Sequence, residues 1–284
     1  MAKDCVKLDN VQSSRCIVEI RSAQEHDKGP VLEFCKDTFS WGDYIADVWD
    51  KWRSSDGLYV CDENGLVVGV YHIAFLAGES WLEGMRVHPR YRKKGLGTKM
   101  MLHAESIIQK GTVRLVIESE NQPSINLVKS VGYHIEEEWR LYSTVPQRQN
   151  FHASVATSTF SLDEFINSDT YADSWKWLPL GRDELENLVV QGRVLVSTDR
   201  EITNAIGIWN KSKDFPQTLQ VGFVNGTKEG MEDVLRFAQD KAHEMGCERI
   251  QVFAPEDTSL DLDFLEKKSM FYLMRKELGK IYNL

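Results

Sequence analysis

The stretch Val87-His-Pro-Arg-Tyr-Arg-Lys-Lys-Gly-Leu-Gly-Thr-Lys99 decides the fold of this chain. Residues 90–99 carry five basic side chains and no acidic one, in a chain whose net charge is −9. Gly111 is expected to end a helix that begins inside the stretch. The helix is predicted because apolar residues recur at helical spacing, namely Leu96, Met100, Met101, Ala104, Ile107 and Ile108.

Two glycines, Gly95 and Gly97, stand where this helix begins. Glycine lets the backbone approach a ligand closely, and the first helical turn points N–H groups with a partial positive charge outward. The stretch is therefore a candidate site for a phosphate or pyrophosphate. The alternative is a basic, solvated helix start that binds nothing.

Length and composition limit the class of protein. A chain of 284 residues corresponds to one large or two ordinary domains, and 42% hydrophobic with 27% charged residues is typical of a globular chain. No apolar run reaches the roughly 18 residues of a membrane span, and no secretory signal opens the chain. Five scattered cysteines without a Cys-x-x-Cys pair argue against a metal site and favour the reducing cytoplasm. A pI near 5.4 argues against a nucleic-acid partner.

The first half predicts a meander followed by a crossover. Asn64-Gly65 between two apolar runs predicts a hairpin, and residues 113–117 are almost wholly apolar, as in a strand that is buried on both faces. Strand, helix and buried strand in succession predict a right-handed parallel unit. We expect strands at residues 16–21, 58–61, 66–74, 81–87, 113–117 and 134–142, and helices at 30–38, from 45 to 52 and at 124–130.

The second half is predicted to be a faded copy of the first. Gly57, Gly111 and Arg114 have counterparts 135 residues later at Gly192, Gly246 and Arg249. The order of predicted elements also recurs, with a hairpin at residues 194–197 and 205–209, a strand at 219–224, a helix from 234 to 242 and a buried strand at 249–253. In the second half, the loop that corresponds to the basic stretch is residues 225–231. It holds a single basic residue, Lys228, next to Glu229, and therefore offers little electrostatic attraction for a pyrophosphate.

Val87-x-Pro89 followed by Arg92-x-x-Gly95-x-Gly97 resembles the acetyl-coenzyme A signature of the GNAT superfamily of N-acetyltransferases. The resemblance implies an α/β fold of two tandem GNAT-like domains, each a mixed, mostly antiparallel sheet with a central parallel strand pair flanked by helices. We place the catalytic domain at residues 1–145, a linker at 146–158 and the degenerate domain at 159–284. Tandem acetyltransferases with one active half, such as mycothiol synthase, are similar in this architecture.

The resemblance also implies site residues. The strand before the basic loop would bind pantetheine through its backbone, with the Met85 amide as the oxyanion donor. Asn121 matches the family's cofactor-contacting asparagine, and Ser124 replaces a common alanine. The cofactor set is then Met85, Arg86, Val87, Arg92, Lys93, Lys94, Gly95, Leu96, Gly97, Thr98, Asn121 and Ser124.

Glu83 is the candidate base, because strand alternation places it on the face of Met85. The alternative is a salt bridge or an anchor for the acceptor's ammonium group, and Glu79 is a weaker candidate. Val128 stands where the family has a tyrosine acid, for which Tyr71, Tyr142 and Ser124 are substitutes. We assign the acceptor pocket to the aromatic segment that contains Phe39, Trp41, Asp43 and Tyr44. The alternative is that these aromatic side chains only pack the core.

The leading function is transfer of an acetyl group from acetyl-CoA to the amine of a small molecule or amino acid, by a monomer or homodimer. The alternatives are acetylation of a protein amine and a non-catalytic acyl-CoA sensor or interaction module.

Overall fold

The computed structural model describes residues 18–38, 42–76 and 78–279. Their contacts divide the chain into two compact units. Unit 1 consists of Met1–His72 with Gly84–His103, and unit 2 consists of Ile73–Glu83 with Ala104–Leu284. None of the helices in the described ranges is long and apolar enough to cross a membrane.

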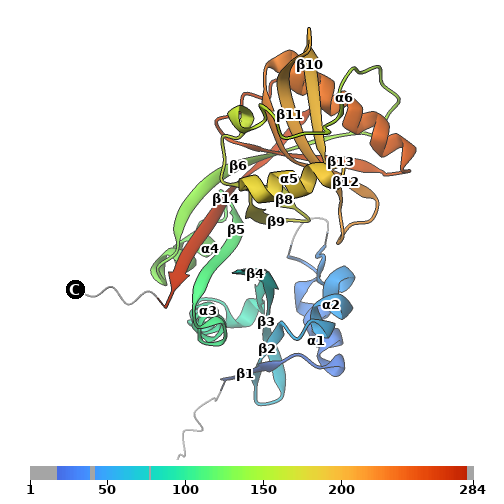
Figure 1. Cartoon of the computed structure of the whole chain (residues 1–284). Helices are drawn as coiled ribbons and strands as arrows, with labels where there is room; N and C mark the ends of the chain where they lie inside the picture. Colours follow the sequence, from blue (N-terminus) through green and yellow to red (C-terminus); the bar gives the residue numbers. More distant parts are fainter. Residues whose placement is uncertain (1–17, 39–41, 77, 280–284) are drawn as a thin grey trace, which may run out of the picture. The chain divides into compact units, whose positions relative to one another are not determined.

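Unit 1 packs two helices on an antiparallel meander (Figure 1). The predicted Asn-Gly hairpin is confirmed, because Asn64 (φ 54°) and Gly65 (φ 86°) both adopt the left-handed conformation that a tight two-residue turn requires. Trp49 and Trp52 bury their rings against the sheet. The elements are β1 (Val18–Ser22), α1 (Lys28–Cys35), α2 (Ile45–Ser54), β2 (Leu58–Glu63) and the first part of β3 (Leu66–Leu76), with 3-10 turns at Glu25–Asp27 and Pro89–Tyr91.

Two further elements pass from one unit to the other, β4 (Glu79–Val87) and α3 (Leu96–Ile108). The predicted helix is confirmed over α3, but its end differs from the expectation. Gln109 (φ 65°) is the left-handed residue after α3, and Gly111 is the first residue of β5 (Gly111–Glu118). A polar side chain therefore adopts the conformation for which a glycine was expected.

Unit 2 is built on a long mixed sheet whose strand order is β4-β5-β14-β6-β13-β12-β11-β10-β7. Helix α6 covers strands β10 to β13 over one apolar cluster, while the small β8–β9 hairpin and α5 contribute to a second cluster rich in tryptophan. The bounds are α4 (Gln122–Ser130), β6 (His134–Thr144), β7 (Ser154–Val155), β8 (Thr170–Asp173), β9 (Lys176–Pro179), α5 (Arg182–Val190), β10 (Val194–Asp199), β11 (Ile202–Lys211), β12 (Thr218–Gly226), α6 (Lys228–Glu244), β13 (Arg249–Pro255) and β14 (Glu266–Leu278), with a 3-10 turn at Asp163–Phe165.

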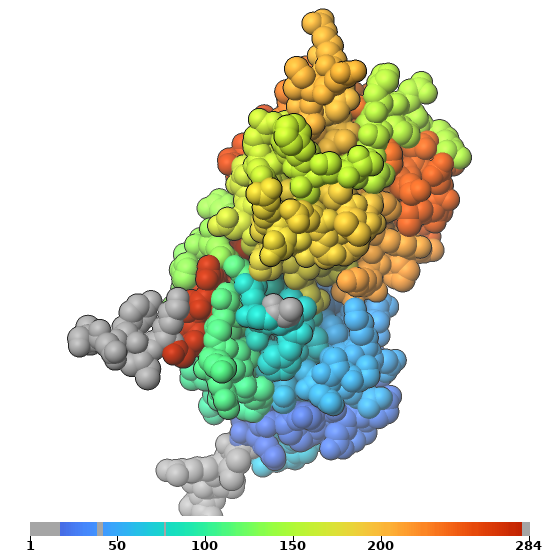
Figure 2. All heavy atoms as spheres, viewed as in Figure 1, coloured from blue at the N-terminus to red at the C-terminus, as the bar shows by residue number. Residues whose placement is uncertain are grey.

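The last strand of the chain lies among strands of the first half. β14 is antiparallel to both β5 and β6, with Leu273 opposite Val116 on one side and Glu137 on the other. β6 in turn pairs with β13, with Tyr142 opposite Val252. Figure 2 shows the red C-terminal residues lying against the green ones of this sheet. The division at residues 145 and 159 stays a prediction, but the two predicted segments share strands of one sheet.

Candidate active site

The basic loop is held in an open conformation by short local contacts. His88 Nδ1 accepts a hydrogen bond from the Arg90 N–H at 3.2 Å, and Arg92 Nε donates to the carbonyl of Val87 at 3.1 Å. Lys93 (φ 60°) and Gly95 (φ 76°) are left-handed. A β-carbon added at Gly95 would meet nothing within 4 Å, so the backbone here is accessible.

The N–H groups of residues 93–98 have no acceptor within the described part of the chain, whereas the Lys99 N–H donates to the Gly95 carbonyl at 3.1 Å. These groups lie at the start of the 13-residue helix α3, whose partial positive charge favours anions. The open glycine, the basic side chains and the available donors fit a diphosphate.

The strand that leads into this loop is kinked at Gly84. Its φ of 65° is left-handed, and an added β-carbon would lie 2.5 Å from the Trp52 ring, so only glycine fits. The strict alternation expected from Trp81 to Val87 is interrupted at this residue. Trp52 and α2 thus decide the path of β4 towards Met85.

Arg86 is held by the segment that was expected to bind the acceptor. Its Nε donates to Asp43 at 2.7 Å, Asp43 also accepts from the Ile45 N–H at 3.1 Å, and the guanidinium lies 5.3 Å from the centre of the Tyr44 ring. Burial lowers the pKa of Arg86, but Tyr44 and Asp43 outweigh this and raise it overall. Asp43 and Tyr44 thus brace β4, and acceptor binding by them stays a prediction. The other two expected pocket residues, Phe39 and Trp41, lie outside the described residues.

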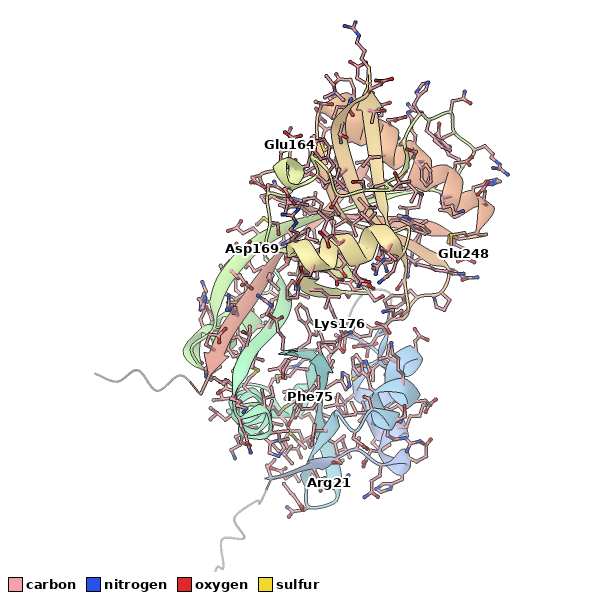
Figure 3. The ribbon with its side chains drawn as sticks, viewed as in Figure 1. Arg21, Phe75, Glu164, Asp169, Lys176 and Glu248 are labelled. Atoms are coloured by element: carbon pink, nitrogen blue, oxygen red, sulfur yellow. The ribbon has the colours of Figure 1, made fainter. Side chains whose placement is uncertain are left out.

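Glu83 forms an ion pair that sequence reasoning missed. Its Oε2 lies 3.1 Å from Nζ of Lys176, which also lies 3.9 Å from Asp214. Lys176 belongs to β9 and is labelled in Figure 3. No local pattern points to this pair, because the two residues are 93 positions apart in the chain.

Glu79 is engaged by a buried arginine. Arg114, which is 5% exposed, contacts both Glu79 and Glu136, the latter at 2.6 Å, and Arg275 of β14 reaches Glu136 at 2.9 Å. One charge network thus joins β4, β5, β6 and β14. A lone arginine inside the apolar run 113–117 was the sequence signal for such a network.

The residues around α4 have structural contacts in unit 2. Asn121 caps the helix by accepting the Ser124 N–H at 3.3 Å; Asn121 is exposed and Ser124 is half-buried. Val128 is buried in the core. Among the substitutes for the missing acid, Tyr71 is buried and its hydroxyl contacts His103 Nδ1. Cofactor contacts by Asn121 and Ser124 stay predictions.

Residues 27–133 match the model of the acetyltransferase (GNAT) family. An alignment over 126 positions, which covers 41% of this chain and 83% of the relative, shows 26% identity to the peptidyl-lysine N-acetyltransferase YiaC of Escherichia coli (strain K12).

Solved structures share the fold over most of the chain. A GCN5-related N-acetyltransferase from Sphaerobacter thermophilus matches 92% of this chain and 95% of its own, with TM-score 0.62 and 14% identity. A putative acetyltransferase from Thermoplasma acidophilum matches 90% and 92%, with TM-score 0.59 and 19% identity. A tandem GNAT protein from the clavulanic acid biosynthesis pathway matches 93% and 99%, with TM-score 0.52 and 12% identity.

Proposed function

We propose, from the match of residues 27–133 to the model of the acetyltransferase (GNAT) family, that this chain transfers the acetyl group of acetyl-CoA to an amine. The observation that carries the proposal is the loop before α3. It combines an open left-handed glycine with a row of N–H donors and a basic surface, at the positions where the family signature stands. Under this proposal residues 92–98 bind the diphosphate.

The parallel strand pair supports the second part of the site. Within unit 2 the register between β4 and β5 covers three residue pairs and ends at Trp81 opposite Arg114. A strand that leaves its parallel neighbour has backbone groups to offer to the pantetheine arm. We assign this role to residues 85–87 and the oxyanion contact to the Met85 amide.

Glu83 is proposed to accept the proton that the acceptor's ammonium group must lose before it attacks. It stands two residues before Met85 in β4, so the two α-carbons lie within about 7 Å of each other by chain geometry alone. The nearby Asp214 adds a second negative charge. A cationic acceptor is therefore favoured.

The proposed acceptor is the amine of a small molecule or an amino acid. A second candidate is the side chain of a peptide lysine, favoured by the similarity to a peptidyl-lysine N-acetyltransferase.

Release of coenzyme A from acetyl-CoA, measured over a panel of small amines, amino acids and lysine peptides, tests the proposal. We expect turnover with at least one class and its loss in Arg92→Glu. Binding of acetyl-CoA without turnover on any acceptor would instead favour the acyl-CoA sensor or interaction module, and the class that is turned over decides between the two acceptors.

A further inference from the structure

A buried histidine of unit 1 lies beside the kink in β4. The His88 N–H donates to the Val68 carbonyl at 2.9 Å, and counting four residues along each antiparallel strand from this pair places His72 opposite Gly84. His72 is 3% exposed, and its ring stacks on Trp52 with ring centroids 4.5 Å apart. An added β-carbon at Gly84 would lie 2.5 Å from the Trp52 ring, so His72 packs against the side chain that sets the kink.

The hydrogen bonds around His72 decide which ring nitrogen donates. Its Nε2 lies 3.2 Å from the Ser55 hydroxyl oxygen, and that hydroxyl group donates its single hydrogen to the Trp52 carbonyl at 2.8 Å. Since a carbonyl oxygen can only accept, Nε2 of His72 carries a hydrogen and donates it to Ser55. The main chain and the ring of Trp52 are therefore held by one cluster, which consists of Trp52, Ser55 and His72.

The kink controls the direction of the Met85 N–H. This N–H belongs to the peptide plane that joins Gly84 to Met85, so the backbone torsions of Gly84 decide where it points. Alternate residues of an antiparallel strand bond to the same neighbour. His88 bonds to β3, and Met85, three residues earlier, therefore points its N–H away from β3. The contact between Trp52 and Gly84 thus helps to aim the proposed oxyanion donor.

We propose that His72 is a positioning residue for acetyl transfer, an inference that rests on the proposed function. Through Ser55 and its own ring it holds Trp52 at Gly84, and Gly84 directs the Met85 N–H at the oxygen of the thioester carbonyl. All these residues belong to unit 1, as does the loop that is proposed to bind the diphosphate. An N–H that is held in advance towards a developing negative charge lowers the barrier, and loss of one such donor lowers kcat by about 10²–10³-fold.

The experiment is steady-state kinetics of the full chain carrying Ser55→Ala, together with the backbone amide NMR signal of Met85 in the same variant. Ser55 is exposed, so the change removes the hydrogen bond to His72 without opening the core. The matched control is Ser54→Ala. Ser54 is also exposed and donates the same kind of bond, to the Lys51 carbonyl at 2.8 Å, one residue earlier in α2.

We expect Ser55→Ala to lower kcat about tenfold, a part of the effect of losing the donor outright, with the KM for acetyl-CoA unchanged and the Met85 signal shifted. His72→Phe keeps a flat ring but lacks the Nε2 hydrogen, and it should have the same effect. The double variant should be no worse than either single one, because both break one bond. Ser55→Thr keeps the hydroxyl group and should restore kcat, and Ser54→Ala should leave it unchanged.

Equal effects of Ser54→Ala and Ser55→Ala, or additive effects in the double variant, would overturn the inference. Wild-type turnover with an unchanged kcat and an unmoved Met85 signal in Ser55→Ala sinks this inference alone. Absence of turnover in the wild type, with the Met85 signal shifted by Ser55→Ala, sinks the proposed function and leaves the link from Ser55 to Met85 standing. Absence of both sinks both.

Discussion

The two parallel strand pairs of unit 2 differ in how far they stay paired. β4 and β5 separate at the arginine, since their register ends with Trp81 opposite Arg114. β12 and β13 begin at the arginine, with Thr218 opposite Arg249, and continue for three further residue pairs to Val221. Both pairs therefore separate before their strands end, but the second pair stays together for three residues beyond its arginine and the first pair for none.

The residues beyond the arginine differ accordingly. Counted from the paired residues, the counterpart of Glu83 is Gln220, a fully buried amide that donates to Gln251 Oε1 at 2.9 Å. The counterpart of Met85 is Gly222, where an added β-carbon would lie 1.8 Å from the carbonyl oxygen of Ala172 in β8. At these two positions β12 is therefore neutral and covered by β8, whereas β4 carries the charged Glu83.

The loops that follow differ in the same sense. The N–H of Gly230, in the first turn of α6, already donates to the Thr227 side chain at 3.1 Å, and a β-carbon there would lie 2.5 Å from Asn204 Oδ1. Gly95 before α3 is open. The start of α6 is therefore capped and crowded, whereas the start of α3 is open.

The largest expected effect concerns Glu83 and Gln220. Glu83→Gln should lower kcat by about 10²–10⁴-fold, because the variant keeps the shape but accepts no proton. Steady-state kinetics with acceptors of different pKa is the measurement, since an acidic limb that stays fixed belongs to the enzyme. A raised KM with unchanged kcat would mean that Glu83 only anchors the acceptor. Gln220→Glu should reduce stability without this kinetic signature.

The two arginines should differ in their cost to stability. Arg114→Met leaves Glu79 and Glu136 without the guanidinium that both contact, so we expect a loss of about 3–5 kcal/mol in the free energy of unfolding. Arg249, whose Nε donates to the Thr218 hydroxyl at 2.8 Å, is exposed, and Arg249→Met should cost about 1 kcal/mol. Urea unfolding compares them, and equal losses would contradict the difference between the two pairs.

Any side chain at Gly222 of β12, which lies under β8, should lower the stability of the protein. Gly222→Ala places a methyl group against the Ala172 carbonyl and should cost about 3 kcal/mol or more, because two backbones would have to separate. Gly95→Ala meets open space and should cost about 1 kcal/mol for its positive φ alone. Thermal unfolding of both variants measures this, and a Gly222→Ala variant as stable as wild type would show that β8 does not close the strand.

Charge reversal in the loop before α3 should lower the affinity for acetyl-CoA about tenfold, whereas the same change before α6 should not. In Lys93→Glu a non-glycine residue still occupies the left-handed backbone conformation at position 93. The variant replaces an attractive charge near the proposed diphosphate with a repulsive one, and a tenfold loss of affinity corresponds to about 1.4 kcal/mol of binding free energy. Lys228→Glu is the matched control at α6 and should leave the affinity unchanged. Titration calorimetry is the test, and a second bound equivalent in wild type would mean that the loop before α6 is also a site.

The smallest effect is one of pH. Burial raises the pKa of Glu136, but Arg114 and Arg275 lower it more, so it lies below the ordinary value overall. A carboxyl group with a lowered folded pKa contributes stability that is complete above its unfolded pKa, about 4.3, and is lost as the pH falls through the folded pKa. The cost of Arg114→Met should therefore shrink in acid, while that of Arg249→Met stays constant. Urea unfolding between about pH 3 and 7 gives both values, and parallel curves would contradict the role of Glu136.

Sequence by itself determined the local features of this protein. The spacing of Leu96, Met100 and Ala104 predicted α3, Asn64-Gly65 predicted its hairpin, and the glycines of the basic loop predicted an accessible backbone where that helix begins. Each depends on periodicity or turn chemistry within about a dozen residues, where backbone conformation and the next helical turn decide the outcome.

Tertiary structure alone decided which distant residues meet. The placement of β14 between β5 and β6, the ion pair of Glu83 with Lys176 and the kink that Trp52 requires at Gly84 join segments far apart in the chain. Such contacts follow from the packing of the whole core, and an apolar strand carries no mark of which neighbour it will pair with. The sequence therefore predicted a loop suited to a diphosphate, and only the fold brought a lysine of the second half to the proposed base.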